Sequence, residues 1–151
     1  MRHFYIRASV HKDDVHPWQG KVTYGPDGYA RVPIGCVALE YNDDIIVNGP
    51  KNALNMAFTF ISPEDNFGYH TANQIAQGRI KAKKYKVVHY DNFVNTIEKN
   101  KAHEIFKEMD FHHKYLKFIH PDLFAVSARA CLKKLALDKL DSEKHKVHAH
   151  D

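Results

Sequence analysis

The sequence lacks the features that mark exported, membrane-spanning or disulfide-bonded proteins. Only two cysteines, Cys36 and Cys131, occur among its 151 residues. Their spacing fits neither a C-x-x-C redox pair nor a zinc site, so we expect two structural thiols in a reducing compartment. No apolar run approaches the roughly 20 residues of a membrane-spanning helix, and residues 1–7 lack the apolar segment of a signal peptide. These absences predict a soluble, cytoplasmic protein that does not contact membranes.

The sequence also lacks the familiar motifs of nucleotide binding and catalysis. It contains no G-x-x-x-x-G-K-[ST] or G-x-G-x-x-G phosphate loop and no G-x-S-x-G nucleophile motif. Twelve histidines are present, but none shows the H-E-x-x-H spacing of a zinc enzyme. Two groups of histidines lie close together in the sequence: His112, His113 and His120, and in the tail His145, His148 and His150. For the tail group we expect adventitious binding at most, and the other three are equally interpreted as surface or satisfied core residues, so we expect no metal site and no cofactor.

Length and composition indicate one globular domain. Hydrophobic residues make up 44% of the chain and charged residues 26%, close to the average of globular proteins. No repeat or linker rich in Pro, Gly or Ser divides the chain, and its length suits one folding unit. We therefore expect a single domain over residues 1–151, in which the polar residues 141–151 form a frayed tail.

Strand-forming segments fill most of the first sixty residues. β-Branched and aromatic residues predict a first strand at 4–10, a central strand at 56–61 and a last strand at 85–90. The pattern of these three segments indicates a sheet formed mainly by the N-terminal two-thirds of the chain.

Two hairpins are predicted between the first and the central strand. The turn Pro26-Asp27-Gly28 lies between the strand-like segments 21–24 and 29–32, which is the strongest hairpin signal of the sequence. An apolar run at 34–41, followed by 45–47, suggests a second hairpin. Because hairpins join antiparallel strands, the sheet is expected to be mostly antiparallel.

Helical periodicity replaces the strand pattern after residue 61. It predicts a helix at 69–83, a second helix from residue 93 with Asp91 as its N-cap, and a last helix that begins at Pro121. Gly78 within the first helix marks either a close backbone contact or a weak point. The predicted fold is α+β: a mostly antiparallel sheet, one helix after the central strand, and a C-terminal helical pair packed on the sheet.

The last helix carries an apolar band that is wider than one packing face requires. Burial between the sheet and a neighbouring helix explains this width, and we favour that interpretation. A homodimer interface through the C-terminal helices explains it as well.

Positive charge is concentrated in the second half of the chain. Residues 1–78 contain 6 Lys and Arg against 8 Asp and Glu, whereas residues 79–151 contain 16 against 10. The densest segment, here called the basic cluster, consists of Arg79, Lys81, Lys83, Lys84 and Lys86. Such a cluster neutralises phosphates and gains affinity from counterion release, which points to nucleic acid. Alternatively, these lysines complement the dipole at the end of a helix.

The segment between the central strand and the first helix is a candidate active site. Asp65 and His70 lie in it, and Arg79 follows in the helix, so the three provide an acid, a titratable group and a cation. A hydrolase or lyase could be built from them. The structural alternative is a helix start with a cap, a turn and an aromatic residue that fixes the loop to the core.

Part of this region resembles a group of small uncharacterised bacteriophage proteins. Those proteins share the pattern P-[IV]-G-C-V-A, then S-P-x-D-x-F, then I-A-x-G-R. The corresponding segments here are Pro33-Ile34-Gly35-Cys36-Val37-Ala38, then Ser62-Pro63-Glu64-Asp65-Asn66-Phe67, then Ile75-Ala76-Gln77-Gly78-Arg79. The resemblance spans about residues 33–80, and where those proteins have Gly-Arg this chain has Asn73-Gln74. It implies phage origin and a role in the host cell cytoplasm during infection, but no reaction.

Three functions follow from these observations. The first is a small phage accessory protein that binds nucleic acid through the basic cluster. The second is an inhibitor that binds a host or defence protein directly through the C-terminal helices. The third is a hydrolase or lyase at Asp65, His70 and Arg79, so enzymatic and non-enzymatic interpretations both stay open.

Overall fold

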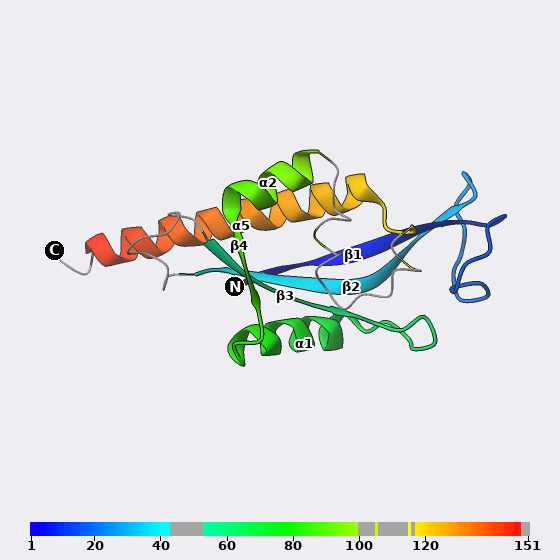
Figure 1. Ribbon diagram of the computed structural model, residues 1–151, viewed down its shortest axis with the longest axis horizontal. Coiled ribbons are helices and arrows are strands. Elements are labelled where there is room, and N and C mark those ends of the chain that lie inside the picture. Colours follow the sequence, from blue (N-terminus) through cyan, green and yellow to red (C-terminus); the bar gives the residue numbers. More distant parts are fainter. Residues whose placement is uncertain (43–52, 100–104, 106–114, 116, 149–151) are drawn as a thin grey trace.

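The computed structural model describes residues 1–42, 53–99, 105, 115 and 117–148 (Figure 1). These residues form four strands and three helices. In chain order the elements are β1 (Arg2–His11), β2 (Tyr29–Tyr41), β3 (Ala53–Phe60), α1 (Tyr69–Lys81), β4 (Lys86–His89), α2 (Tyr90–Glu98) and α5 (Pro121–His148).

The four strands form one antiparallel sheet in the order β1-β2-β3-β4, so each strand pairs with its neighbour along the chain. Figure 1 shows α1 on one side of this sheet and α2 and α5 on the other. The predicted α+β class with an antiparallel sheet is confirmed. The described residues thus make three layers, with the sheet in the middle.

Alternation along the strands builds a different core on each face. In β1, Phe4, Ile6, Ala8 and Val10 are buried and belong to the large core that also contains Phe124 of α5. Burial of each larger aliphatic side chain of this kind contributes about 1.5–3 kcal/mol. The opposite face carries a smaller core under α1.

Small side chains seat α1 on the sheet. Cys36 and Ala38 of β2 and Ala57 of β3 pack with three residues of one α1 face, Ala72, Ala76 and Ile80. The spacing of four residues places these α1 side chains in one row. Because alanine and cysteine are short, α1 lies close to the strands.

Strand β2 joins two segments that were expected to be separate. The β1–β2 register shifts between Ile6 and Arg7, which pair with Gly35 and Pro33, so Ile34 is the extra residue of a β-bulge. Proline has no N–H group to donate to a ladder and is tolerated at such an irregularity. The predicted strands 29–32 and 34–41 are therefore one strand.

The first predicted hairpin is wrong in its first arm. Residues 21–24 form no strand, and β2 pairs with β1 instead. The turn itself is present, because Gly28 N–H donates to Gly25 O at 2.9 Å. Gly28 has a φ of +83°, a conformation that favours glycine, and an added Cβ would lie 2.7 Å from His11 Nε2, so the His11 ring would have to shift.

The second predicted hairpin cannot be compared in full, since residues 45–47 lie outside the described residues. The described partner of β2 is β3, from Gly35 opposite Phe60 to Tyr41 opposite Leu54. Strand β3 begins three residues before the predicted start at residue 56.

The end of α1 and the start of α2 differ from the predicted boundaries by a few residues, and most of the helical stretch predicted from residue 93 onward lies outside the described residues. Helix α1 ends at Lys81 rather than at residue 83, and α2 begins at Tyr90 with His89 as its N-cap, so the prediction of Asp91 as N-cap is wrong. Asp91 lies in the first turn of α2, where a carboxylate still complements the helix dipole.

Helix α5 begins at Pro121, as predicted, and extends to His148, through residues 141–148 that were expected to fray. Its N-cap is His120, whose Nδ1 accepts a hydrogen bond from Leu123 N–H at 3.2 Å. In the second half of α5, Asp138 accepts hydrogen bonds from Arg2 of β1 with both carboxylate oxygens, at 2.7 and 2.8 Å. The start of the chain is thereby linked to its last helix.

The residues before α5 cover part of the outer edge of β1. Ser9 N–H donates to Phe118 O at 2.7 Å, and Ala8 forms an isolated antiparallel bridge with Ile119. These contacts satisfy backbone groups at an edge that has no neighbouring strand among the described elements.

Candidate functional site

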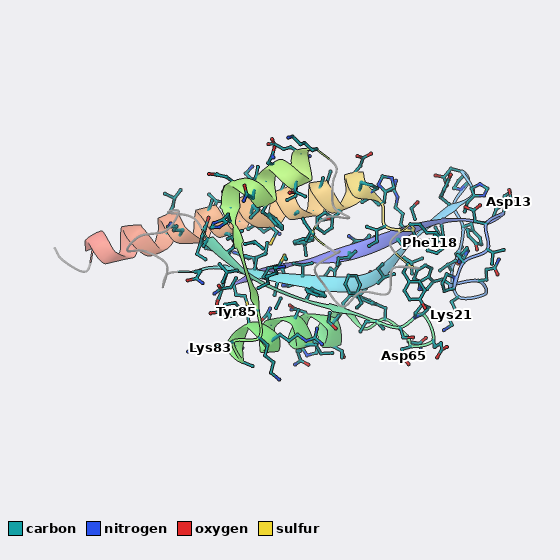
Figure 2. The ribbon with its side chains drawn as sticks, viewed as in Figure 1. Asp13, Lys21, Asp65, Lys83, Tyr85 and Phe118 are labelled. Atoms are coloured by element: carbon teal, nitrogen blue, oxygen red, sulfur yellow. The ribbon has the colours of Figure 1, made fainter. Side chains whose placement is uncertain are left out.

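The basic cluster surrounds the end of α1. Arg79 and Lys81 lie in the last turn of α1, Lys83 and Lys84 lie in the turn that follows, and Lys86 is the first residue of β4. All five residues are exposed. Figure 2 shows Lys83 at the end of α1 that is far from the loop carrying Asp65.

Backbone hydrogen bonds fix the turn after α1. Lys84 N–H donates to Arg79 O at 2.8 Å, and Lys83 N–H donates to Ile80 O at 3.0 Å, the pair of bonds that defines a Schellman motif. Lys83 takes the left-handed conformation, with a φ of +58°. Glycine is the usual residue at this position, and a side chain there costs about 1 kcal/mol.

Two members of the basic cluster, Arg79 and Lys86, make contacts that set them apart from the other three. An Arg79 N–H donates to the backbone oxygen of Phe58, which lies beyond the last β3–β4 pair, Met56 with Lys86. Arg79 thus binds a strand carbonyl that β4 does not reach. Lys86 lines a cavity together with Phe93 of α2. The cluster is therefore divided, and Lys81, Lys83 and Lys84 remain together as what we call the α1 corner.

The α1 corner has no described acidic neighbour to neutralise it. Residues 66–90 contain no Asp or Glu. Among the described residues, the ion pairs are Arg2 with Asp138 and His11 with Asp13, and neither involves the α1 corner. Its positive charge is consequently available to an anion from solution.

Gly78 lies one helical turn before Lys81 on α1. A Cβ added at Gly78 would meet no atom within 4 Å, and the residue has no positive φ. The described fold therefore gives no reason for glycine at this position, where alanine would favour the helix by about 1 kcal/mol. Of the two interpretations offered by the sequence, a close backbone contact within the described part of the chain is wrong.

A cavity lies at the opposite end of the molecule. It has a volume of about 310 Å³ and lies between residues 18–23, the beginning of β2 and residues 61–67. Lys21, Arg31 and Asp65 are among its lining residues. Figure 2 shows Lys21 and Asp65 near each other at this end, well away from Lys83.

A buried histidine braces the loop 12–28 that forms one wall of the cavity. His16 Nδ1 accepts a hydrogen bond from Trp18 N–H at 3.1 Å, so Nε2 carries the proton and donates to the Tyr24 hydroxyl at 2.6 Å. His16 and Trp18 are each only 5% exposed. In the sequence, Trp18 is the one signal of this arrangement, because a large aromatic residue among polar ones indicates a buried position.

The structure does not bring the three candidate catalytic residues together. Asp65 lines the cavity, His70 is exposed in the first turn of α1, and Arg79 follows nine residues later. At 1.5 Å per residue, this separation along the helix is about 13 Å. Arg79 also binds Phe58 O. No hydrogen bond or ion pair among the described residues joins any two of these three side chains.

Cysteines and histidines show no reactive centre in the described structure. Both cysteines are buried, and desolvation raises the pKa of Cys36 to about 12 and that of Cys131 to about 11, which keeps both thiols protonated. Among the described residues no group of three His, Cys, Asp or Glu side chains is arranged to hold a metal. His112, His113 and His150 lie outside the described residues.

Comparisons with protein-family models, with curated proteins and with solved structures give no match for this chain. Within the described residues, no helix combines the length and apolarity needed to cross a bilayer. The candidate functional sites are therefore the α1 corner and the cavity beside loop 12–28.

Proposed function

We propose that the protein binds nucleic acid through the α1 corner. The observation that carries this proposal is a set of three exposed lysines, Lys81, Lys83 and Lys84, within a 25-residue stretch without a carboxylate. Lysines that neutralise phosphates release condensed counterions, and this release drives binding without regard to sequence. In this proposal, three of the five residues of the basic cluster contact phosphates directly. Arg79 instead holds α1 to β3.

Local conformation supports a function at this corner. Gly78 is found where the helix favours alanine, and Lys83 is found where the turn favours glycine. Departures from local preference that nothing in the fold compensates are concentrated at functional sites. We place the phosphate backbone across the outer side of α1, where Gly78 leaves room beside Lys81.

The setting of this function follows from the resemblance of residues 33–80 to phage proteins. We propose a small accessory protein that acts on nucleic acid in the host cell cytoplasm during infection. The proposal requires no enzymatic step.

The test is the salt dependence of binding to labelled DNA and RNA, measured by fluorescence anisotropy between about 50 and 200 mM salt. On duplex DNA, the slope of log K against log salt should become shallower by about 1.8 units in the variant Lys81→Gln with Lys84→Gln. This corresponds to about 0.9 units for each lost phosphate contact. The matched control, Lys133→Gln with Lys134→Gln on α5, removes the same charge and should keep the slope.

Charge reversal of Lys83 and Lys84 to Glu should abolish the salt-sensitive binding altogether. An unchanged slope in the α1-corner variants, or an equal loss in the α5 control, would show that binding does not use this corner.

A second candidate function is binding of a protein through α5. Six apolar residues of α5 are buried, whereas Val126, Leu137 and Leu140 are 60%, 53% and 53% exposed. Exposed apolar side chains on one helix favour a protein partner, either a host protein that is inhibited or a second copy of this chain. If the partner is a second copy, light scattering should show a dimer that Leu137→Gln with Leu140→Gln converts to monomer.

A further inference from the structure

We propose that the cavity beside loop 12–28 binds a small zwitterionic ligand, a molecule that carries an amine and a carboxylate on an apolar body. This site is separate from the α1 corner and lies at the other end of the sheet (Figure 2). The proposal therefore stands or falls independently of nucleic-acid binding.

The size and walls of the cavity suit a small organic molecule. Its volume of about 310 Å³ lies at the lower end of the range of about 300–1,000 Å³ that is typical of ligand pockets. Trp18 and Phe67 give it aromatic walls, and Pro33 and Ile61 add apolar surface. Such surfaces bind the body of a ligand, while a few polar groups set its orientation.

The charges around the cavity are of both signs and are not paired with one another. Lys21, Arg31 and Asp65 all line it, yet none of them forms an ion pair among the described residues. A ligand with both charges fits this arrangement, because its carboxylate can accept two hydrogen bonds from the Arg31 guanidinium while its amine donates to Asp65. A purely anionic or cationic ligand would leave one of these groups unused.

The cavity is formed in advance of binding. The Lys21 ammonium donates to Pro63 O at 2.5 Å, which ties loop 12–28 to the segment between β3 and α1. His16 fixes the backbone of Trp18, and the Trp18 ring packs against Tyr115 and Phe118. A loop of this length without strand or helix is commonly a functional one, and a preformed wall lowers the entropic cost of binding.

Three related probes test the proposal by NMR chemical-shift titration of the full chain. L-Phenylalanine carries both charges, 3-phenylpropionate lacks the amine, and 2-phenylethylamine lacks the carboxylate. L-Phenylalanine should shift the amide signals of Trp18, Arg31 and Asp65 and bind at least about tenfold more tightly than either analogue, since each analogue loses the charge-assisted hydrogen bonding at one of its ends. Equal affinities for the three probes, or no shifts around the cavity, would overturn the proposal.

Two variants assign the roles of the charged groups. Arg31→Gln should weaken L-phenylalanine and 3-phenylpropionate but not 2-phenylethylamine, whereas Asp65→Asn should weaken L-phenylalanine and 2-phenylethylamine but not 3-phenylpropionate. Lys12→Gln and Asp14→Asn are matched controls, because they remove the same charges from exposed positions outside the cavity lining. If the controls weaken binding as much as the variants, the effect is one of net charge and the assigned roles are wrong.

The variant Lys81→Gln with Lys84→Gln should leave all three titrations unchanged. Failure of this cavity proposal would leave the α1 corner as it is, and the reverse is also true, since the two sites share no residue.

Discussion

The two ends of the molecule are stabilised in different ways. At the cavity end, loop 12–28 contains no strand or helix, yet its buried polar atoms are paired through His16, and Gly28 has a positive φ, which favours glycine. At the α1 corner the secondary structure is regular, yet Gly78 and Lys83 oppose the local preferences of helix and turn. The comparison shows that an irregular segment can be well determined by its hydrogen bonds, while a regular one can carry unfavourable residues.

The largest effect is expected from removing His16, whose hydrogen bonds fix loop 12–28 at the cavity end. His16→Ala should lower the free energy of unfolding by about 2–3 kcal/mol, because it leaves Trp18 N–H and the Tyr24 hydroxyl without their buried partner and opens a void. Urea denaturation measures the change. His70→Ala, at an exposed position of α1, is the control and should change stability by less than about 0.5 kcal/mol. Equal effects of the two substitutions would remove the distinction between the ends.

Alanine at two glycines should change stability in opposite directions. Gly28→Ala should destabilise the fold by about 1–3 kcal/mol, because it combines a positive φ with a contact to His11. Gly78→Ala should stabilise it by about 1 kcal/mol and weaken nucleic-acid binding, since the methyl group occupies the space beside Lys81. Thermal unfolding and anisotropy report the two effects. A destabilising Gly78→Ala would contradict our interpretation of this residue.

Replacement of Lys83 with glycine isolates the strain of the turn after α1. Lys83→Gly should raise the free energy of unfolding by up to about 1 kcal/mol, since glycine adopts the left-handed conformation without steric cost. Lys84→Gly removes the same charge from the next residue, which has no positive φ, and should not stabilise. If both variants gained stability equally, the gain would come from lost charge repulsion rather than from relieved strain.

The smallest expected effect is a pH dependence at His3, which lies in β1 and belongs to neither end. Desolvation, with repulsion from Lys134 and Arg2, lowers the pKa of His3 below its ordinary value of 6.5. The unfolded chain then takes up this proton first as the pH falls. The contribution of His3 is therefore present above about pH 6.5 and is lost as the pH falls through the folded-state pKa.

His3→Gln should remove that part of the pH dependence. Urea midpoints at pH 7.5 and at pH 5.5 should lie closer together in the variant than in the original protein, by a small amount. A wider separation would mean that the sign of the shift is wrong.

The local sequence pattern predicted the regular strands and helices correctly. It failed where contacts between residues far apart in the sequence determine the backbone conformation. The alternation in β1 and the helical spacing of Ala72, Ala76 and Ile80 each gave the correct element, because one face of each is buried. Residues 21–24 have strand-like composition but lie in a loop, where Tyr24 binds His16 instead of a neighbouring strand. The predicted strands 29–32 and 34–41 stop on either side of Pro33, whereas the structure accommodates this proline at a bulge.

The functional residues were predictable only in part. The lysines of the α1 corner are adjacent in sequence, so composition found them. Composition did not show that Arg79 is engaged by a strand carbonyl or that Lys86 belongs to another cavity. The cavity charges Lys21, Arg31 and Asp65 come from three separate segments that only the folded chain brings together, so no local pattern could reveal them.

The backbone contacts of β1 with residues 118–119 form late in synthesis, because the two segments are far apart in the sequence. β1 leaves the ribosome before the other described elements, but the segment that covers its outer edge is made only after more than a hundred further residues. Until then this edge exposes N–H and C=O groups that can pair with another nascent copy. Synthesis truncated before Phe118 is accordingly expected to yield self-associating chains, whereas the finished protein covers this part of the edge itself.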